Sequence, residues 1–103
     1  MKLAPLTYRV AHWADSREVR GYAIQLPPPF AGLRFCVRKS GRQWFVDHYD
    51  SGIGANGNIT STYSRRDAVE RLVLRLHAQV EDGTLRKQFD RYGYGWCLDE
   101  AGL

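Results

Sequence analysis

The chain has 103 residues, of which 44% are hydrophobic and 25% are charged, and its formal net charge is +4 at pH 7. A chain of this length forms one hydrophobic core, and an aromatic content of 13% excludes a disordered segment, whose composition is poor in such residues. No stretch reaches the roughly 18 apolar residues that a bilayer span needs, and the N-terminus lacks the apolar region of a signal peptide. We therefore expect a single soluble, cytoplasmic domain over residues 1–103 with no membrane partner.

The first elements in chain order are two stretches of alternating residues. Residues 1–19 are difficult to assign, although the alternation in "LTYRVAHW", residues 6–13, is compatible with a short strand. In "RGYAIQL", residues 20–26, the apolar side chains share one face, which is the period of a half-buried strand. This strand must end at Pro27–Pro29, because proline donates no backbone hydrogen bond.

The next two runs, "GLRFCVRK" and "RQWFVDHYD", alternate again and are joined by a short loop that contains Gly41. This pattern predicts a β-hairpin. If Val46 points toward the core, Trp44 does too, and Phe45 and Tyr49 lie on the opposite face. The reverse orientation would bury Asp47, which is costly without a partner, so we expect Phe45 and Tyr49 to form an exposed aromatic patch.

A third strand and two helices follow a glycine-rich connection. "NITSTY" is rich in β-branched residues and predicts the strand. Ser64, with Asp67 three residues later, predicts a capping box in which Asp67 reaches back to the cap. The helix behind it carries an apolar stripe and ends at Gly83, and a shorter helix follows from Thr84. The stripe consists of Ala68, Val69, Leu72, Val73, Leu76 and Val80.

These elements predict an α+β fold. An antiparallel sheet of three to four strands occupies residues 20–63, helices occupy residues 64–92, and residues 93–103 form an extended aromatic tail, which either covers the core or serves as an interaction arm. The main helix packs on one sheet face, and such a sheet normally leaves its other face to solvent. We expect the binding surface on that second face.

The residues suited to catalysis or metal binding are few. Cys36 and Cys97 lack a secretory context, so we expect two reduced, packed thiols rather than a disulfide. The three histidines are far apart in sequence, and we expect neither a metal nor a cofactor. The candidate catalytic group is His48 with Asp47 and Asp50, to which His12 could be added, but Asp47 and His48 point to opposite sides of a strand. We expect no enzyme activity; a nuclease-like hydrolase would need His48 and a carboxylate in one cleft.

Cations gather around the predicted hairpin tip and the start of the main helix. Arginine suits phosphate recognition because its planar fork donates two parallel hydrogen bonds. A basic hairpin tip is also a common device against edge-to-edge aggregation, so both interpretations stay open. The helix dipole disfavours cations in a first helical turn by about 0.3–1 kcal/mol each. Their presence there therefore favours a role in binding. The cations are Arg34, Arg38, Lys39 and Arg42 at the hairpin, and Arg65 and Arg66 at the helix.

Residues 34–76 combine a strand, a basic turn with Gly41, an aromatic strand opening on Trp44, an acidic turn, and a third strand running into a capped helix with Ala68 near its start. This pattern resembles AP2-type DNA-binding domains and the arm-binding domains of phage and transposon integrases. The resemblance implies a three-stranded sheet that lies in the major groove of DNA. It would make Arg34, Arg38, Arg42 and Trp44 candidate DNA contacts.

Two functions therefore stand side by side. The first is a small, non-enzymatic accessory protein that binds nucleic acid, DNA rather than RNA, through its basic hairpin. The alternative is a protein-binding regulator or inhibitor of phage or mobile-element type, with the sheet-face aromatics as anchors and arginines at the rim. The candidate contacts for either partner are Arg34, Arg38, Lys39, Arg42, Phe45, Tyr49, Arg65 and Arg66.

Overall fold

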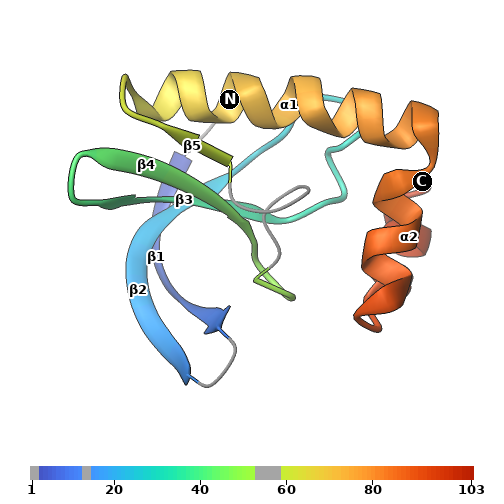
Figure 1. Cartoon of the computed structure of the whole chain (residues 1–103), viewed down its shortest axis with the longest axis horizontal. Coiled ribbons are helices and arrows are strands. Elements are labelled where there is room, and N and C mark those ends of the chain that lie inside the picture. The colour runs from blue at the N-terminus through green and yellow to red at the C-terminus, as the bar shows by residue number, and fades with distance from the viewer. Residues whose placement is uncertain (1–2, 13–14, 53–58) are drawn as a thin grey trace.

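The computed structural model describes residues 3–12, 15–52 and 59–103 and shows one sheet with three helices (Figure 1). The strands form a five-stranded antiparallel sheet in sequential order, and α1 lies across one face of it. The α+β class with an antiparallel sheet is confirmed, but the sheet has more strands than the expected three to four. The elements are β1 (Leu3–His12), β2 (Asp15–Ile24), β3 (Phe35–Ser40), β4 (Gln43–His48), β5 (Ile59–Ser61), α1 (Arg65–Asp82), α2 (Thr84–Arg91) and α3 (Gly95–Glu100).

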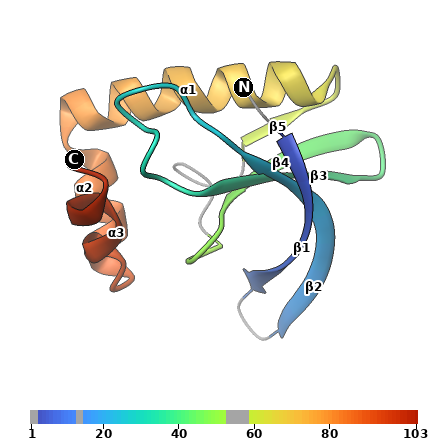
Figure 2. The ribbon, with the colours of Figure 1, turned by 180° about the vertical axis from the view of Figure 1, so that it is seen from behind.

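The additional strand is β1, and β2 is longer than expected; both differences lie in the N-terminal segment. β1 and β2 pair along their whole length, from Leu3 opposite Ile24 to His12 opposite Asp15. Only the last three residues of β2 pair with β3, so the rest of the β1–β2 hairpin curves away from the sheet on the side opposite α1 (Figures 1 and 2). The strand expected from residue 20 begins five residues earlier, at Asp15, because its hairpin with β1 extends it.

Gly21 allows the close approach of β1 to the middle of the sheet. A Cβ atom at Gly21 would lie 2.5 Å from the carbonyl oxygen of Val37 and 2.8 Å from Cε1 of Tyr8. No side chain fits at these distances, so glycine is the residue that lets the Tyr8 ring lie against β2. Tyr8 thereby reaches β4.

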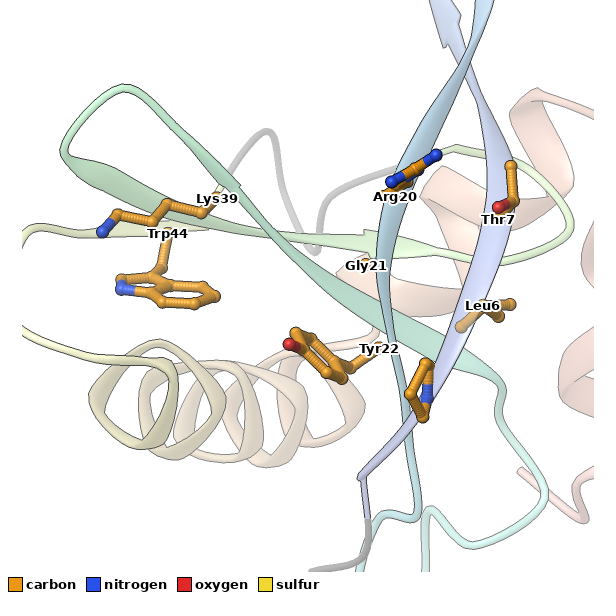
Figure 3. A pocket seen from close by; sticks show the side chains of 8 residues that line it. Leu6, Thr7, Arg20, Gly21, Tyr22, Lys39 and Trp44 are labelled. Atoms are coloured by element: carbon orange, nitrogen blue, oxygen red, sulfur yellow. The ribbon is translucent and has the colours of Figure 1, made fainter.

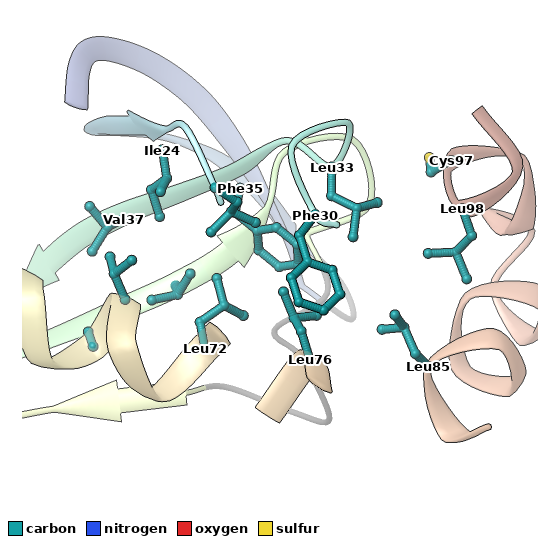
Figure 4. Packing of buried hydrophobic residues seen from close by; sticks show 14 of the residues in the cluster. Ile24, Phe30, Leu33, Phe35, Val37, Leu72, Leu76, Leu85, Cys97 and Leu98 are labelled. Atoms are coloured by element: carbon teal, nitrogen blue, oxygen red, sulfur yellow. The ribbon is translucent and has the colours of Figure 1, made fainter. Parts of the chain in front are cut away.

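The main core fills the space between the sheet and α1 (Figure 4). Val37 and Val46 come from the sheet, Leu72 and Leu76 come from α1, and all four are fully buried. The loop after β2 adds Phe30 and Leu33, and α2 and α3 close one end of the core. The residues from these two helices are Leu85, Phe89, Cys97 and Leu98.

The ends of α1 are confirmed by their caps. The Ser64 hydroxyl accepts a hydrogen bond from the Asp67 backbone N–H at 3.0 Å, and Gly83 ends the helix in the left-handed conformation at φ +79°. The side chain of Asp67, however, accepts from the Ser61 hydroxyl and pairs with Arg71 at 3.1 Å instead of reaching back to the cap. Ser61 on β5 therefore ties the sheet to the first turn of the helix.

One position of the predicted apolar stripe is wrong. Val80 is 45% exposed, and Gln79 is buried in its place. At 100° per residue, Gln79 lies about 20° from Leu72 around the helix axis, whereas Val80 lies about 80° away. The buried face therefore continues through a polar residue.

The expected extended tail is also wrong, because residues 95–100 form α3. Gly93 turns the chain back at φ +82°, which places α3 against α2. Arg86 on α2 holds this turn by donating to the Gly95 carbonyl oxygen at 3.2 Å and to the Asp99 carboxylate at 2.8 Å. Cys97 is buried, while Trp96 is 48% exposed. Within the described ranges, no helix has the length and apolar character needed to cross a bilayer.

Candidate functional site

A groove of about 640 Å³ opens where the β1–β2 hairpin leaves the sheet (Figure 3). It lies beside the N-terminal end of α1, because Arg65, the first residue of that helix, contacts two of the rings that line it. We call it the aromatic groove. Its lining consists of Pro5, Leu6, Thr7, Arg20, Gly21, Tyr22, Lys39 and Trp44.

Two aromatic residues from different strands define this groove. Tyr22 on β2 and Trp44 on β4 are half-buried, and both pack against the main core. Tyr22 is opposite Val37 in the sheet register, and Val37 is opposite Val46, so these side chains share the face that α1 covers. The prediction that Trp44 and Val46 point to the same side is confirmed. The core fixes the two rings and leaves part of each accessible.

Cations lie against both rings. The guanidinium carbon of Arg65 is 4.7 Å from the centroid of the Tyr22 ring and 5.7 Å from that of Trp44. Lys39 is opposite Trp44 in the sheet, and its Nζ lies 5.6 Å from the Trp44 ring centroid. Arg20 lines the groove from β2. These cation–π contacts hold positive charge beside the aromatic surface.

The charge around the aromatic groove is not neutralised by carboxylates. Among the side chains that the structure describes, in residues 3–8, 18–52 and 60–103, no ion pair involves Arg20, Lys39, Arg42 or Arg65, and the groove lining contains no acidic residue. The N-terminal end of α1 adds its positive dipole. Elsewhere five arginines are paired: Arg34 with Asp50, Arg38 with Asp47, Arg66 with Glu70, Arg71 with Asp67, and Arg86 with Asp90 and Asp99. Exposed Arg75 and Arg91 form no ion pair with the residues whose side chains are described, but neither lines the groove.

Arg38 does not lie on the accessible hairpin surface, and this expectation is wrong. It is 5% exposed, its Nε donates to Oδ2 of Asp47 at 2.9 Å, and its guanidinium carbon lies 4.6 Å from the centroid of the Phe45 ring. Asp47, expected in solvent, is fully buried and also accepts from the Tyr8 hydroxyl at 3.4 Å. The sequence pattern missed this because Tyr8 lies 39 residues away from Asp47.

Of the two aromatic side chains expected on an exposed sheet face, only Tyr49 is exposed. Phe45 faces away from α1, as its register predicts, but it is half-buried beneath Arg38. Tyr49 is 37% exposed, with the Arg34 guanidinium carbon 4.8 Å from its ring centroid. The β1–β2 hairpin covers much of this face, where Tyr8 and Cys36 form a small second core. The expectation of a solvent-facing sheet surface is therefore wrong over the centre of the sheet.

The residues considered for catalysis are only partly brought together. His48 Nε2 lies 3.8 Å from Oδ2 of Asp50, whereas Asp47 points to the opposite face. Burial lowers the pKa of His48 to about 4, although Asp50 opposes this shift, so the imidazole is neutral near pH 7. The side chain of His12 lies outside the described residues. Cys36 and Cys97 are free and buried, as predicted.

No known protein family, curated protein or solved structure is similar to the chain. The resemblance to AP2-type and integrase arm-binding domains therefore stays a prediction, although Arg38, one of its candidate contacts, is buried. Of the groove residues, the sequence prediction named only Lys39 and Trp44 as contacts, and it missed the cation Arg20 and the aromatic Tyr22. Their alternation in residues 20–26 was visible, but the β2–β3 pairing that sets Tyr22 beside Trp44 was not.

Proposed function

We propose that the protein is a small nucleic-acid-binding accessory protein that holds a single-stranded segment in the aromatic groove. The observation that carries this proposal is the set of unpaired cations around Tyr22 and Trp44 in a groove without carboxylates. Aromatic faces stack unpaired bases of any sequence, and nearby cations attract the phosphates. Lys39 and Arg65 are placed for phosphates and Trp44 for a base.

The shape of the groove favours an unpaired strand over a duplex. A volume of about 640 Å³ accommodates a ligand the size of one or two nucleotides. The bases of a duplex are already stacked on each other and cannot reach a recessed tryptophan without flipping out. Arg42 is exposed and follows Gly41 at the tip of the β3–β4 hairpin. It therefore extends the positive surface beyond the groove, where a phosphate of the bound single-stranded nucleic acid can contact it.

The alternative of a protein-binding sheet face receives less support. It relies on Phe45 and Tyr49 as anchors, and Phe45 is half-buried under Arg38. Hot spots at interfaces are large side chains that enter a partner's pocket, which a covered ring cannot do. The groove is the better-supported contact surface.

The direct test is fluorescence anisotropy with a labelled single-stranded DNA, its RNA equivalent and a duplex of the same length. We expect the single strands to bind more tightly than the duplex, and affinity to fall with salt. If Lys39, Arg42 and Arg65 each contact a phosphate, the slope of log K against log salt should be about −2 for a single strand. Absence of binding at low salt would overturn the proposal.

A matched pair of charge reversals locates the site. Lys39→Glu should weaken binding and flatten the salt slope, because Lys39 lies against Trp44. Lys87→Glu makes the same change at an exposed position of α2, which lies at the other end of α1 (Figure 1). It should leave the salt slope of binding unchanged. Equal effects of the two variants would show non-specific attraction instead of groove binding.

Removal of the stacking surface gives an independent readout. Trp44→Leu keeps an apolar side chain against the core and removes the aromatic face. Stacking contributes about 1–3 kcal/mol per base, so we expect affinity to drop about 5- to 150-fold. Arg38 is unsuitable for such a test, because its reversal would break a buried ion pair.

A further inference from the structure

Three potential metal ligands from distant parts of the chain meet beside the main core. His48 is the last residue of β4, Asp50 lies in the following turn, and Cys97 lies on α3. One nitrogen, one carboxylate oxygen and one sulfur from these side chains all lie within 4.8 Å of one another. His48 and Cys97 are buried, and Asp50 is only 17% exposed. The cluster is separate from the aromatic groove, whose lining includes none of these residues.

The orientation of His48 points an unpartnered nitrogen into this cluster. His48 is 1% exposed, and among the described residues its Nε2 has no hydrogen-bond partner, since the distance of 3.8 Å to Asp50 is too long. Phe35 and Phe89 contact the imidazole edge-on, with ring centroids at 5.2 Å and 4.9 Å, and fix its plane. A buried imidazole nitrogen without a partner is costly and needs an explanation.

The surroundings of each ligand supply the contacts that orient metal-binding side chains. Nδ1 of His48 lies 2.8 Å from the Ser51 hydroxyl, which can accept a hydrogen bond from Nδ1–H and so leave the Nε2 lone pair for a metal. The Ser51 backbone N–H also lies 3.3 Å from Nδ1, so metal binding selects one of two tautomers. Arg34 holds Oδ1 of Asp50, and this leaves Oδ2 on the side of His48.

We propose that His48, Asp50 and Cys97 form a binding site for a divalent transition-metal ion of the zinc type. One imidazole, one carboxylate and one thiolate are the donors that such ions take, with bonds of about 2.0–2.3 Å. Tetrahedral bonds of this length place the ligand atoms about 3.3–3.8 Å apart, so the cluster needs only a small contraction. A water molecule completes the fourth position.

The ion would act as a clamp between two distant parts of the chain. On binding, the S–H bond of Cys97 breaks, a metal–sulfur bond forms, and the proton passes to solvent. The ion then links the end of β4 to α3, which also packs on α2. The result is a tighter attachment of the C-terminal helices to the sheet. The histidine spacing could not predict this site, because the other two ligands are an aspartate and a distant cysteine.

The test uses the full chain, stripped with a chelator under reducing conditions and titrated with Co²⁺ and then Zn²⁺. We expect one equivalent of Co²⁺ to bind, with a thiolate-to-cobalt charge-transfer band and the intense visible absorption of a tetrahedral site. Zn²⁺ should displace it, and at 100 times its Kd should raise the Tm by roughly 10–20 °C. No charge-transfer band and no Tm shift would overturn the proposal.

Two cysteine variants make the assignment specific. Cys97→Ser should lose the charge-transfer band and weaken binding at least about 100-fold, because it removes the thiolate ligand. Cys36→Ser changes the other buried cysteine, on β3, and should keep both the band and the affinity. Far-UV circular dichroism in chelator verifies that each variant is folded. A band that survives in Cys97→Ser would contradict the site.

Discussion

The two faces of the β3–β4 hairpin are both buried, but by different chemistry. On the α1 side, Val37 and Val46 pack against Leu72 without any charged group between them. On the other side, Arg38 and Asp47 form an ion pair at 5% and 0% exposure beneath the β1–β2 hairpin. A strand with one apolar and one charged face therefore does not have to leave the charged face in solvent.

The two faces should respond differently to damage. Apolar burial contributes roughly 1.5–3 kcal/mol per large side chain, and the loss of one such side chain leaves no uncompensated charge behind. A buried ion pair barely exceeds its own desolvation cost, yet removal of one partner leaves an uncompensated charge. The ionic face should therefore be sensitive to single substitutions and tolerant of a paired apolar replacement.

The largest effect is expected from Asp47→Ala. It leaves the Arg38 guanidinium buried without its carboxylate and removes the acceptor of the Tyr8 hydroxyl. We expect a loss of about 3–5 kcal/mol in the free energy of unfolding, measured by urea denaturation. Glu70→Ala, which breaks the exposed Arg66–Glu70 pair, is the matched control and should cost about 0.5 kcal/mol or less.

The double variant Arg38→Met/Asp47→Leu sharpens this test. It removes both charges and keeps a similar volume, so it should recover most of the stability lost in Asp47→Ala. If the double variant were as unstable as the single one, the pair would contribute through its geometry instead of its charge balance.

The second prediction concerns the apolar face. Leu72→Ala removes a fully buried side chain from the centre of α1 and leaves a cavity against the sheet. We expect a loss of about 2–5 kcal/mol by the same urea measurement. In the double variant, this loss should simply add to that of Asp47→Ala, because Leu72 and Asp47 share no partner. Strong non-additivity would show that the faces are coupled.

The apolar face was largely predictable from the sequence. Helical spacing placed Leu72 and Leu76 correctly, the Ser64 cap and Gly83 gave both ends of α1, and strand alternation gave the orientation of Val46 and Trp44. Each of these features is decided by residues within a few positions of one another. The error at Val80 arose because the stripe was chosen by apolar residue type. The polar residue Gln79 lies nearer the buried face by its angle around the helix axis.

The ionic face and the aromatic groove were not predictable in this way. Asp47 was expected in solvent because its partner Tyr8 lies on a strand that local patterns barely indicated. The groove needs β2 to lie beside β3, so Tyr22 meets Trp44 only through strand pairing. Local alternation tells which residues share a strand face, and it does not tell which strand will cover that face.

A third prediction tests how the covering hairpin approaches the sheet. Gly21→Ala would place a methyl group 2.5 Å from the Val37 carbonyl oxygen and 2.8 Å from the Tyr8 ring. We expect a loss of about 1–3 kcal/mol, because the backbone or the ring must shift. Tyr8→Ala removes one of the two clashes. In denaturation experiments, the double variant Gly21→Ala/Tyr8→Ala should therefore lose less stability than the sum of the losses in the two single variants. Full additivity would argue against the contact with Tyr8.

The smallest expected effect is a loss of stability at alkaline pH that arises from Cys36 on the ionic face. Burial, followed by the nearby Asp47, raises the pKa of Cys36 from 9.0 to about 12. Above pH 9 the unfolded thiol ionises while the folded one stays protonated, so stability falls as pH rises toward 12. For Cys36 alone, the loss between pH 8 and pH 10 is about 1.4 kcal/mol.

Cys36→Ala should remove that part of the alkaline loss, and a further decline should remain because burial also raises the pKa of Tyr8 and of Cys97. Leu72→Ala removes a side chain that cannot ionise, so it should lower stability equally at both pH values. The measurement is urea unfolding at pH 8 and pH 10 under reducing conditions. A parallel decline in wild type and Cys36→Ala would mean that the thiol ionises as easily in the folded protein as in the unfolded chain. The β1–β2 hairpin would then not exclude water from the ionic face.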